Sequence, residues 1–502
     1  MRDLVRAEAL LDDPRLAVAI VAIEAALPVG VRPRQCPVRT FLLGVLLCQA
    51  DGRPAHLSRV HETLCSLRAA DRWRLGVLVE AKDKGVPHLL TYRQTEYLNH
   101  LLGRVLTNEE PDGLATRRLQ DLLDALLDAS VPASYAGASR ALALDWTDVC
   151  SFAHPPGKDG ISADPEAAWG HRRGGGPGEK SELFFGHYAN LATMVADEDG
   201  PEVPELVRQM TLSSCDHDPV PVATAALVER FATGELLPGD VLADSGYAHR
   251  VPEHFALPLR AAGASLVMDL HPSDRATQGT FAGAICANGN LYCPKTPSAL
   301  FALSPLPRGA SLEETAAHDD ESAELSRYKL GRITSDDEDG YHRVACPAVS
   351  GKCRCPLRHA SMALAYTHPT VLEPPEHPPV CCTQQSVTVP PAVNAKTRQR
   401  HDYPSKAWRI SYARRSAVER SNARIKDPAT IDVAKGWCRV MGLVTPSLFL
   451  AVALVVRNLA LVDAFESRQA ENERRRAIGL PPRTRRRRRT SLVELAGANA
   501  PP

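Results

Sequence analysis

The order of short apolar segments between residues 141 and 269 most strongly limits what this chain can fold into. Three consecutive segments have strand character, and helix and strand patterns then alternate. Three strands can form a meander, and alternating elements can extend the same sheet in parallel, so the order predicts a mixed α/β sheet. The segments are strands at 141–149, 183–195 and 205–212, a helix at 222–231, a strand at 241–243, a helix after Pro252 and a strand at 265–269.

The segments on either side of this region have different patterns of apolar residues. Apolar residues recur every three or four positions in the first 130 residues, as around Phe41, Leu42, Val45 and Leu46, which predicts helices. Helix patterns return at 412–426 and 446–466. We therefore expect a helical N-terminal domain that could bind DNA ends (1–135), the first part of an α/β core (136–270), a Cys- and Pro-rich insertion with an acidic stretch at 313–339 (271–395), the C-terminal helices of the core (396–468) and an Arg-rich tail (469–502).

Composition indicates an ordinary soluble globular protein. The chain has 502 residues, of which 44% are hydrophobic and 24% charged, and this excludes disordered and collagen-like classes. The apolar stretch at 443–456 is shorter than the roughly 18 residues that a spanning helix needs, so we interpret it as a buried core helix. No early segment resembles an export signal. We expect a cytoplasmic protein without a membrane partner, whose 13 cysteines are reduced.

The balanced charge of the whole chain hides a strong polarity. Lys and Arg number 59, as do Asp and Glu, but residues 396–502 alone contain 23 basic and 9 acidic residues. Part of this excess is the run from Arg485 to Arg489. Such a run is either a solvated tail or a contact with nucleic acid.

Three acidic residues are candidate metal ligands. Asp145 is placed at the end of the first predicted strand, Asp244 follows the strand at 241–243, and Glu419 lies inside the helix at 412–426. Ligands in open α/β sheets gather at strand ends, and carboxylates suit Mg²⁺ because it prefers oxygen. Taken singly, a strand-end Asp is more often a turn or cap residue.

The helix around Glu419 has a distinctive pattern. Tyr412, Arg415, Glu419 and Lys426 follow one another at intervals of three, four and seven residues, so the last three share one helix face. That face presents two cations around a carboxylate. The alternative interpretation is an ordinary surface pair of Arg415 and Glu419, which contributes only a few tenths of a kcal/mol.

Together these features resemble the DDE transposases of bacterial insertion sequences, in the cut-and-paste group with an RNase H-like catalytic domain. The resemblance covers residues 141–458 and depends on the order of strands, the phrase Ala-Asp-Ser-Gly-Tyr at 243–247 and the Tyr-Arg-Glu-Lys helix. The segments 164–170 and 185–188 also resemble the second and third strands of that family. It implies an RNase H-like mixed sheet with flanking helices, an insertion before the last catalytic helix and an all-α N-terminal domain.

The resemblance also implies roles for individual residues. Asp145, Asp244 and Glu419 would hold two Mg²⁺ or Mn²⁺ ions, and Tyr412, Arg415 and Lys426 would contact phosphates of the transposon end. Asp145 is preferred to Asp148 because the family has Thr two residues after the first Asp. The implied partners are transposon ends and target DNA, bound by a homodimer on paired ends, with the protein on the nucleoid.

The insertion contains a second candidate metal site. Cys293, Cys346, Cys353 and Cys355 stand beside prolines in a way that resembles turn-borne zinc ligands, although their spacing is not that of a standard Cys-x₂-Cys pair. Buried free thiols are the alternative.

The predicted function is therefore a transposase that binds terminal inverted repeats, cleaves phosphodiester bonds and transfers the 3′-hydroxyl end to target DNA. Two alternatives stay open. A metal-dependent nuclease without strand transfer would share the fold, and a zinc-containing DNA-binding regulator would use the cysteines and the basic tail.

Overall fold

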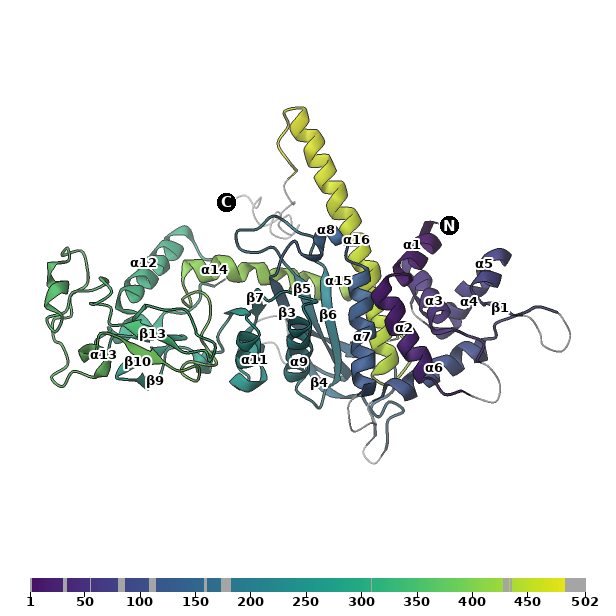
Figure 1. Cartoon of the computed structure of the whole chain (residues 1–502), viewed down its shortest axis with the longest axis horizontal. Helices are drawn as coiled ribbons and strands as arrows, with labels where there is room; N and C mark the ends of the chain where they lie inside the picture. Colours follow the sequence, from purple (N-terminus) through teal and green to yellow (C-terminus); the bar gives the residue numbers. More distant parts are fainter. Residues whose placement is uncertain are drawn as a thin grey trace, which may run out of the picture.

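The computed structural model describes residues 2–29, 34–54, 56–79, 86–107, 114–157, 160–172, 182–307, 309–427, 433 and 436–483. The N-terminal helices, the central sheet and the insertion follow one another along the long axis of the molecule, and the C-terminal helix projects away from that axis (Figure 1). The Arg485 to Arg489 run lies outside the described residues.

The N-terminal region is helical, as its apolar spacing predicts, with one small antiparallel hairpin in addition. Helix α2 begins at Pro14, and the side chain of Asp13 caps it by accepting from two backbone N–H groups. The elements are α1 (Arg2–Leu11), α2 (Pro14–Ala26), α3 (Val38–Ala50), α4 (Leu57–Ser66), α5 (Ala69–Arg74), β1 (Leu78–Val79), β2 (His88–Leu89), α6 (Tyr92–Leu106), α7 (Leu114–Ala129) and α8 (Ala133–Ala136).

A mixed sheet forms the centre of the molecule and confirms the predicted α/β class. Its strand order is β4-β5-β3-β7-β8, and β6 also pairs with β5. Strand β5 is antiparallel to β3, β4 and β6, whereas β7 is parallel to β3 and β8 is parallel to β7. The strands are β3 (Leu142–Cys150), β4 (Ala168–Arg172), β5 (Glu182–Met194), β6 (Val207–Ser214), β7 (Asp240–Ala243) and β8 (Ser265–Met268).

The predicted strands agree with these bounds closely, and β4 is an additional strand. Of the two phrases that resemble family strands, residues 185–188 lie within β5, but the segment 164–170 becomes strand only at Ala168. The helices after the meander are α9 (Pro219–Ala232), α10 (Ser245–Ala248) and α11 (Ala256–Ala261), with a 3₁₀ turn η1 (Pro252–His254).

Both faces of the sheet are buried, and the alternation along β7 shows this directly. Val241 and Ala243 join the core beneath α9 and α11, whereas Leu242 joins the core formed with α7, α15 (Ser416–Ile425) and α16 (Val444–Ala477). A strand that is buried on both faces is largely apolar, which explains why these strands could be predicted from the sequence.

The insertion is more regular than its sequence indicated. It contains two three-stranded antiparallel sheets and a 17-residue helix, α12, which a capping box of Ser311 and Glu314 begins. Only His318, Leu325 and Tyr328 of α12 are buried, so it lacks the apolar periodicity that would have predicted it. The elements are η2 (Pro272–Asp274), β9 (Thr277–Phe281), β10 (Ala284–Ala287), β11 (Asn290–Tyr292), η3 (Ser298–Ala302), α12 (Leu312–Tyr328), β12 (Gly331–Arg332), β13 (His342–Ala345), η4 (His359–Ala363), α13 (Val380–Thr383) and β14 (Val387–Val389).

The predicted single helix at 412–426 is wrong in detail. The chain forms α14 (Lys406–Tyr412), a 3₁₀ turn η5 (Ala413–Arg415) and then α15 (Ser416–Ile425). The two arginines of the turn bind acids on different strands: Arg414 pairs with Asp240, and Arg415 with Asp145 and Asp244. These contacts are a physical reason for the tighter turn, because they hold the side chains of Arg414 and Arg415 in different directions, each toward its own acids.

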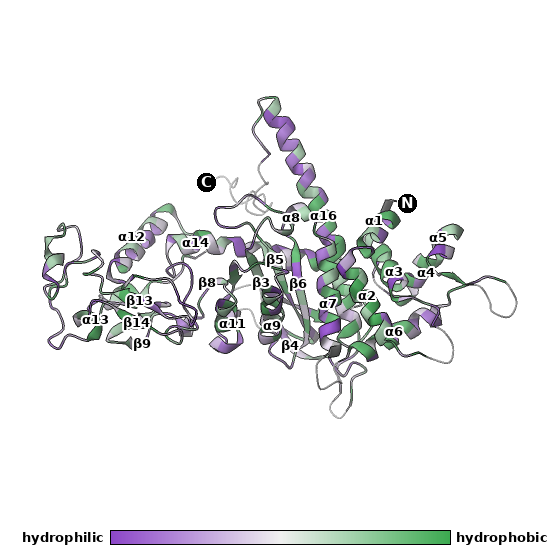
Figure 2. Ribbon diagram, viewed as in Figure 1, coloured by the Kyte–Doolittle hydropathy of each residue, from purple (hydrophilic) through white to green (hydrophobic). Residues whose placement is uncertain are grey.

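The last helix, α16 (Val444–Ala477), is longer than the predicted 446–466 and includes the start of the predicted tail. By length and composition it could cross a membrane, but 67% of its apolar 18-residue segment is buried within the protein. Its apolar half packs against the sheet and the N-terminal helices, and its far half is hydrophilic (Figure 2). The first half is thus a core helix.

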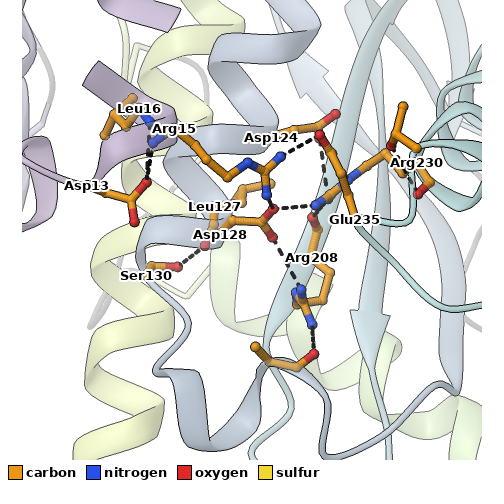
Figure 3. A network of polar contacts seen from close by, with 12 residues as sticks. Asp13, Arg15, Leu16, Asp124, Leu127, Asp128, Ser130, Arg208, Arg230 and Glu235 are labelled. Carbon is orange, nitrogen blue, oxygen red and sulfur yellow. Dashed lines mark hydrogen bonds and ion pairs between the residues drawn. The ribbon is translucent and has the colours of Figure 1, made fainter. Parts of the chain in front are cut away.

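A polar network joins the N-terminal helices to the sheet (Figure 3). Asp128 of α7 accepts from Arg15 of α2 at 2.7 Å and from Arg208 of β6 at 3.3 Å, and it also pairs with Arg230 of α9. Glu235 completes the network with Arg15 at 2.6 Å and Arg230 at 3.1 Å. Because Arg208 and Arg230 are buried, their charges are compensated inside the protein rather than by water.

Candidate active site

Two of the predicted acids lie level with each other on neighbouring strands. The parallel pairing of β3 and β7 aligns Ala143 with Leu242, and Asp145 and Asp244 each follow two residues later. The prediction that Asp145 lies at the end of its strand is wrong, because β3 continues its pairing with β5 as far as Cys150. It does lie just beyond the last residue that pairs with β7.

The phrase around Asp244 forms a compact turn. The Asp244 carboxylate accepts from the backbone N–H groups of Gly246 and Tyr247 at 2.9 and 3.3 Å and so caps α10. A Cβ on Gly246 would lie 2.5 Å from the Trp146 ring, which explains the glycine at this position. The Tyr247 hydroxyl donates to Asn190 on β5 at 2.8 Å and fixes the turn to the sheet.

Arg415 brings all three predicted acids together. Its Nη1 donates to Glu419 Oε1 at 2.7 Å. Its Nη2 lies 3.3 Å from Asp145 Oδ1 and 3.3 Å from Asp244 Oδ2. The Arg415 side chain is 8% exposed, so these contacts form in a largely dehydrated position. One guanidinium therefore contacts three carboxylates, one on β3, one at the start of α10 and one on α15.

Asn422 adds a fourth contact to this group. Its Nδ2 donates to Asp145 Oδ2 at 2.9 Å, so Asp145 is bound by Arg415 of η5 and by Asn422 of α15. Burial raises the pKa of Asp145 to about 6, with the Arg415 charge acting in the opposite direction. The sequence gave no indication of a role for Asn422, because an amide gives no signal of its own.

The other residues predicted to bind DNA have partners within the protein. Lys426 pairs with Asp148 of β3, and Arg172 of β4 binds the same carboxylate. Tyr412 stacks on Trp408 with 5.0 Å between ring centroids. The preference for Asp145 over Asp148 agrees with this geometry, because Asp145 shares Arg415 with Asp244 and Glu419 whereas Asp148 does not join that group.

The donor set fits a hard divalent cation in its chemistry. Asp145, Asp244 and Glu419 offer carboxylate oxygens, the ligands that Mg²⁺ and Mn²⁺ prefer. Within the described ranges, however, these three oxygens are not gathered within 4.8 Å of one another, because Arg415 lies between them. Metal binding by this set would require Arg415 to withdraw.

Comparison of the chain with family models, with curated proteins and with solved structures finds no match. The geometry of the site therefore carries the functional argument.

A different group, missed in the sequence, does have three candidate ligand atoms within 4.8 Å: His249, His271 and Asp274. The Lys396 ammonium already binds the Asp274 carboxylate at 2.7 Å and lies 3.4 Å from His249 Nδ1. A positive charge thus occupies this group. His249 is distant in the sequence from His271 and Asp274, and the pattern gave no reason to group the three.

The four cysteines predicted as zinc ligands, Cys293, Cys346, Cys353 and Cys355, share one buried cluster of the insertion. Tetrahedral zinc would bring its sulfurs to about 3.8 Å from one another. Among the residues that the structure describes, no three of their sulfurs lie within 4.8 Å of one another. Burial raises the pKa of Cys293 to about 12, which favours the neutral thiol in the absence of a metal. The zinc site stays a prediction.

Proposed function

We propose that this protein is a DNA transposase of the DDE class, which cleaves phosphodiester bonds at transposon ends and joins the 3′-hydroxyl end to target DNA. The observation that carries the proposal is the contact of one buried arginine with Asp145, Asp244 and Glu419. A surface pair of Arg415 and Glu419 would require neither the burial of the arginine nor two further acids on neighbouring strands.

The strand arrangement supports an RNase H-like core as part of the proposal. Strands β3, β5 and β6 follow one another in the chain, interrupted only by the short β4, and β5 pairs antiparallel with both β3 and β6. Strands β7 and β8 extend the sheet in parallel on the other side of β3. The first acid is on the central strand β3, the second follows β7, and the third is on a helix that packs on β3 and β5. The insertion lies between the second and third acids.

The residues of the site have separate tasks in this proposal. Asp145, Asp244 and Glu419 would hold two Mg²⁺ or Mn²⁺ ions, which activate an attacking oxygen and stabilise the leaving oxygen at phosphorus. Arg415 neutralises the carboxylates before the ions bind, and Asn422 orients Asp145. Tyr412, Arg415 and Lys426 are the proposed contacts with phosphates of the DNA end, and assembly as a homodimer on paired ends is part of the same proposal.

Replacing Glu419 with Gln tests this proposal. Gln keeps the shape of the side chain but removes the charge that a divalent ion requires, so strand cleavage should fall by at least about a hundredfold while end binding persists. Glu313→Gln, at an exposed position of α12, is the matched control. Cleavage should be measured on DNA carrying the terminal repeats of the element, and binding by electrophoretic mobility shift in EDTA.

Unchanged cleavage by Glu419→Gln would contradict the site assignment. A strand-transfer assay with a 3′-hydroxyl donor end then separates the transposase from a nuclease. If wild-type protein cleaves but never joins the donor end to target DNA, the nuclease is the correct function.

A further inference from the structure

Two loops that follow β7 and β8 bring three metal-ligating side chains together. His249 ends the short helix α10 that Asp244 caps, whereas His271 caps the turn η2 after β8 and Asp274 ends it. Since β7 and β8 are parallel neighbours, their carboxyl ends meet at one edge of the sheet, and the loops that follow lie side by side. The candidate ligand atoms of His249, His271 and Asp274 all lie within 4.8 Å of one another.

The spacing within this group fits a small bound ion. His249 Nδ1 lies 3.4 Å from Asp274 Oδ2. Two ligands of a tetrahedral zinc ion, with bonds of about 2.0 to 2.2 Å, are about 3.4 Å apart. These two atoms would therefore bind one ion without moving toward each other. The His249 side chain is 46% exposed, so a fourth position on such an ion would be open to water, as it is in many zinc sites with three protein ligands.

A neighbouring side chain orients one of the two imidazole rings. His271 Nδ1 lies 2.7 Å from Ser273 Oγ. In metal sites the second nitrogen of a histidine ligand usually contacts another polar group, which fixes the orientation of the ring. Ser273 provides such a contact for His271. The His249 ring lies beside the His271 ring, with 4.0 Å between the centroids.

The Lys396 ammonium lies at this group and shows that the group stabilises a cation. Its Nζ binds both oxygens of Asp274, at 2.9 and 2.7 Å, and lies 3.4 Å from His249 Nδ1. Lysine has no acceptor, so the contact with Nδ1 is favourable when that nitrogen presents its lone pair, which is the form that binds metals. Lys396 is 25% exposed and has a flexible four-carbon stem, so its ammonium can withdraw to solvent when an ion competes.

The donor set of this group differs from that of the three carboxylates around Arg415. Two imidazoles and one carboxylate suit Zn²⁺ and related transition metals. Mg²⁺ prefers oxygen ligands alone, so it would compete poorly for two histidines. The two groups are therefore expected to select different ions, although both lie beside the turn that carries Asp244.

We propose that His249, His271 and Asp274 bind one Zn²⁺ ion, which displaces the Lys396 ammonium and links the loop after β7 to the loop after β8. This inference does not depend on the proposed function. The segment of Lys396 stays attached to the core when its ammonium leaves, because Arg260 Nη2 donates to the Arg398 carbonyl at 3.0 Å and Arg400 pairs with an acid of β7 at 2.7 Å. Displacement therefore requires only the side chain to move.

Titration of the full chain with Co²⁺ tests the site, because the absorption of Co²⁺ reports its ligands, and Zn²⁺ is then added to displace it. Excess Mg²⁺ in the buffer occupies the carboxylates around Arg415. His249→Ala and His271→Ala should each weaken binding at least about tenfold, since each removes one ligand. The part of the Co²⁺ signal that His249→Ala loses should lack thiolate charge-transfer bands, which would indicate the cysteines of the insertion.

Lys396→Met should bind Zn²⁺ at least about tenfold more tightly than the wild type, because it removes the competing cation. A gain of affinity cannot result from misfolding. His254→Ala, at an exposed histidine of η1 outside the group, is the matched control and should bind as the wild type does. Equal binding by the wild type and His249→Ala would overturn the inference. Binding by Lys396→Met alone would also overturn it, since the lysine would then be the permanent occupant.

The outcome is independent of the test of the active site. Glu419→Gln leaves the three ligands intact, so it should bind Zn²⁺ as the wild type does, whatever its cleavage activity. Absence of histidine-dependent metal binding in a wild type that cleaves DNA would refute this inference alone. Cleavage by Glu419→Gln would refute the proposed catalytic site alone.

Discussion

At the scale of single residues, Arg415 cannot bind the three carboxylates and a DNA phosphate at the same time. Both of its Nη atoms are engaged with Glu419, Asp145 and Asp244, and its Nε is buried. The same atoms would be needed to bind a phosphate of DNA in a bidentate manner. If a DNA phosphate draws Arg415 away, the three carboxylates become available together, which would couple DNA binding to metal binding.

Replacing Arg415 with Gln should therefore increase the affinity of DNA-free protein for Mn²⁺, by about tenfold, because it removes a competing cation and leaves three carboxylates repelling one another. Titration of Mn²⁺ followed by electron paramagnetic resonance measures this directly. Arg414→Gln is the control, since Arg414 pairs with Asp240 and does not contact the three acids. An unchanged Mn²⁺ affinity would mean that Arg415 does not compete for the site.

At the scale of helices and strands, the network between α7 and α9 contains a carboxyl group with an unusual protonation. Burial raises the pKa of Asp124 to about 7, and Arg230 and Gln120 oppose the shift. Arg230 Nη1 lies 3.7 Å from Asp124 Oδ1, and Arg230 is already compensated by Asp128 and Glu235. Burial thus disfavours the charged form of Asp124.

Asp124→Asn should stabilise the protein more at pH 8 than at pH 5. The unfolded carboxyl ionises near its usual value, whereas the folded one holds its proton up to about pH 7. The folded state therefore binds more protons between these values, and the wild type loses stability as pH rises through this window. Asn does not titrate, so the variant avoids this loss, by at least about 1 kcal/mol at pH 8.

Thermal melting at both pH values checks this expectation. Asp463→Asn, at an exposed residue of α16 that pairs with Arg6, should shift the melting temperature similarly at pH 5 and pH 8. Equal effects of Asp124→Asn at the two pH values would contradict a raised pKa of Asp124.

The sequence predicted the elements whose physical signals are local. Short apolar runs located β7, β8 and the apolar parts of β3 and β5, since both faces of the sheet are buried. It could not predict α12, whose exposed surface has little apolar periodicity, or the 3₁₀ turn at Arg415, which depends on acids distant in the chain. It also grouped Asp145, Asp244 and Glu419 but gave no indication that one guanidinium would lie between them.

At the scale of the whole molecule, the charge polarity of the chain is partly neutralised by the fold. Basic residues after position 396 pair with acids from the acidic remainder: Arg409 with Asp319 of α12, and Arg420 with Glu205. Asp319 belongs to the acidic stretch at 313–339, so part of that stretch serves to dock the insertion on α14. These paired arginines add little to the attraction of DNA.

The attraction of DNA should therefore depend strongly on the Arg485 to Arg489 run, and replacing these five arginines with glutamines tests this. Each phosphate contact contributes about 0.9 to the slope of log affinity against log salt. The variant should bind DNA more weakly at low salt, with a slope that is less steep by up to about 4 to 5. Arg468→Gln is the control and should change the slope by less than about 1, because Arg468 is already paired with Glu202. Fluorescence anisotropy of labelled duplex DNA across a salt series measures both, and an unchanged slope in the five-glutamine variant would place the DNA-binding charge elsewhere on the protein.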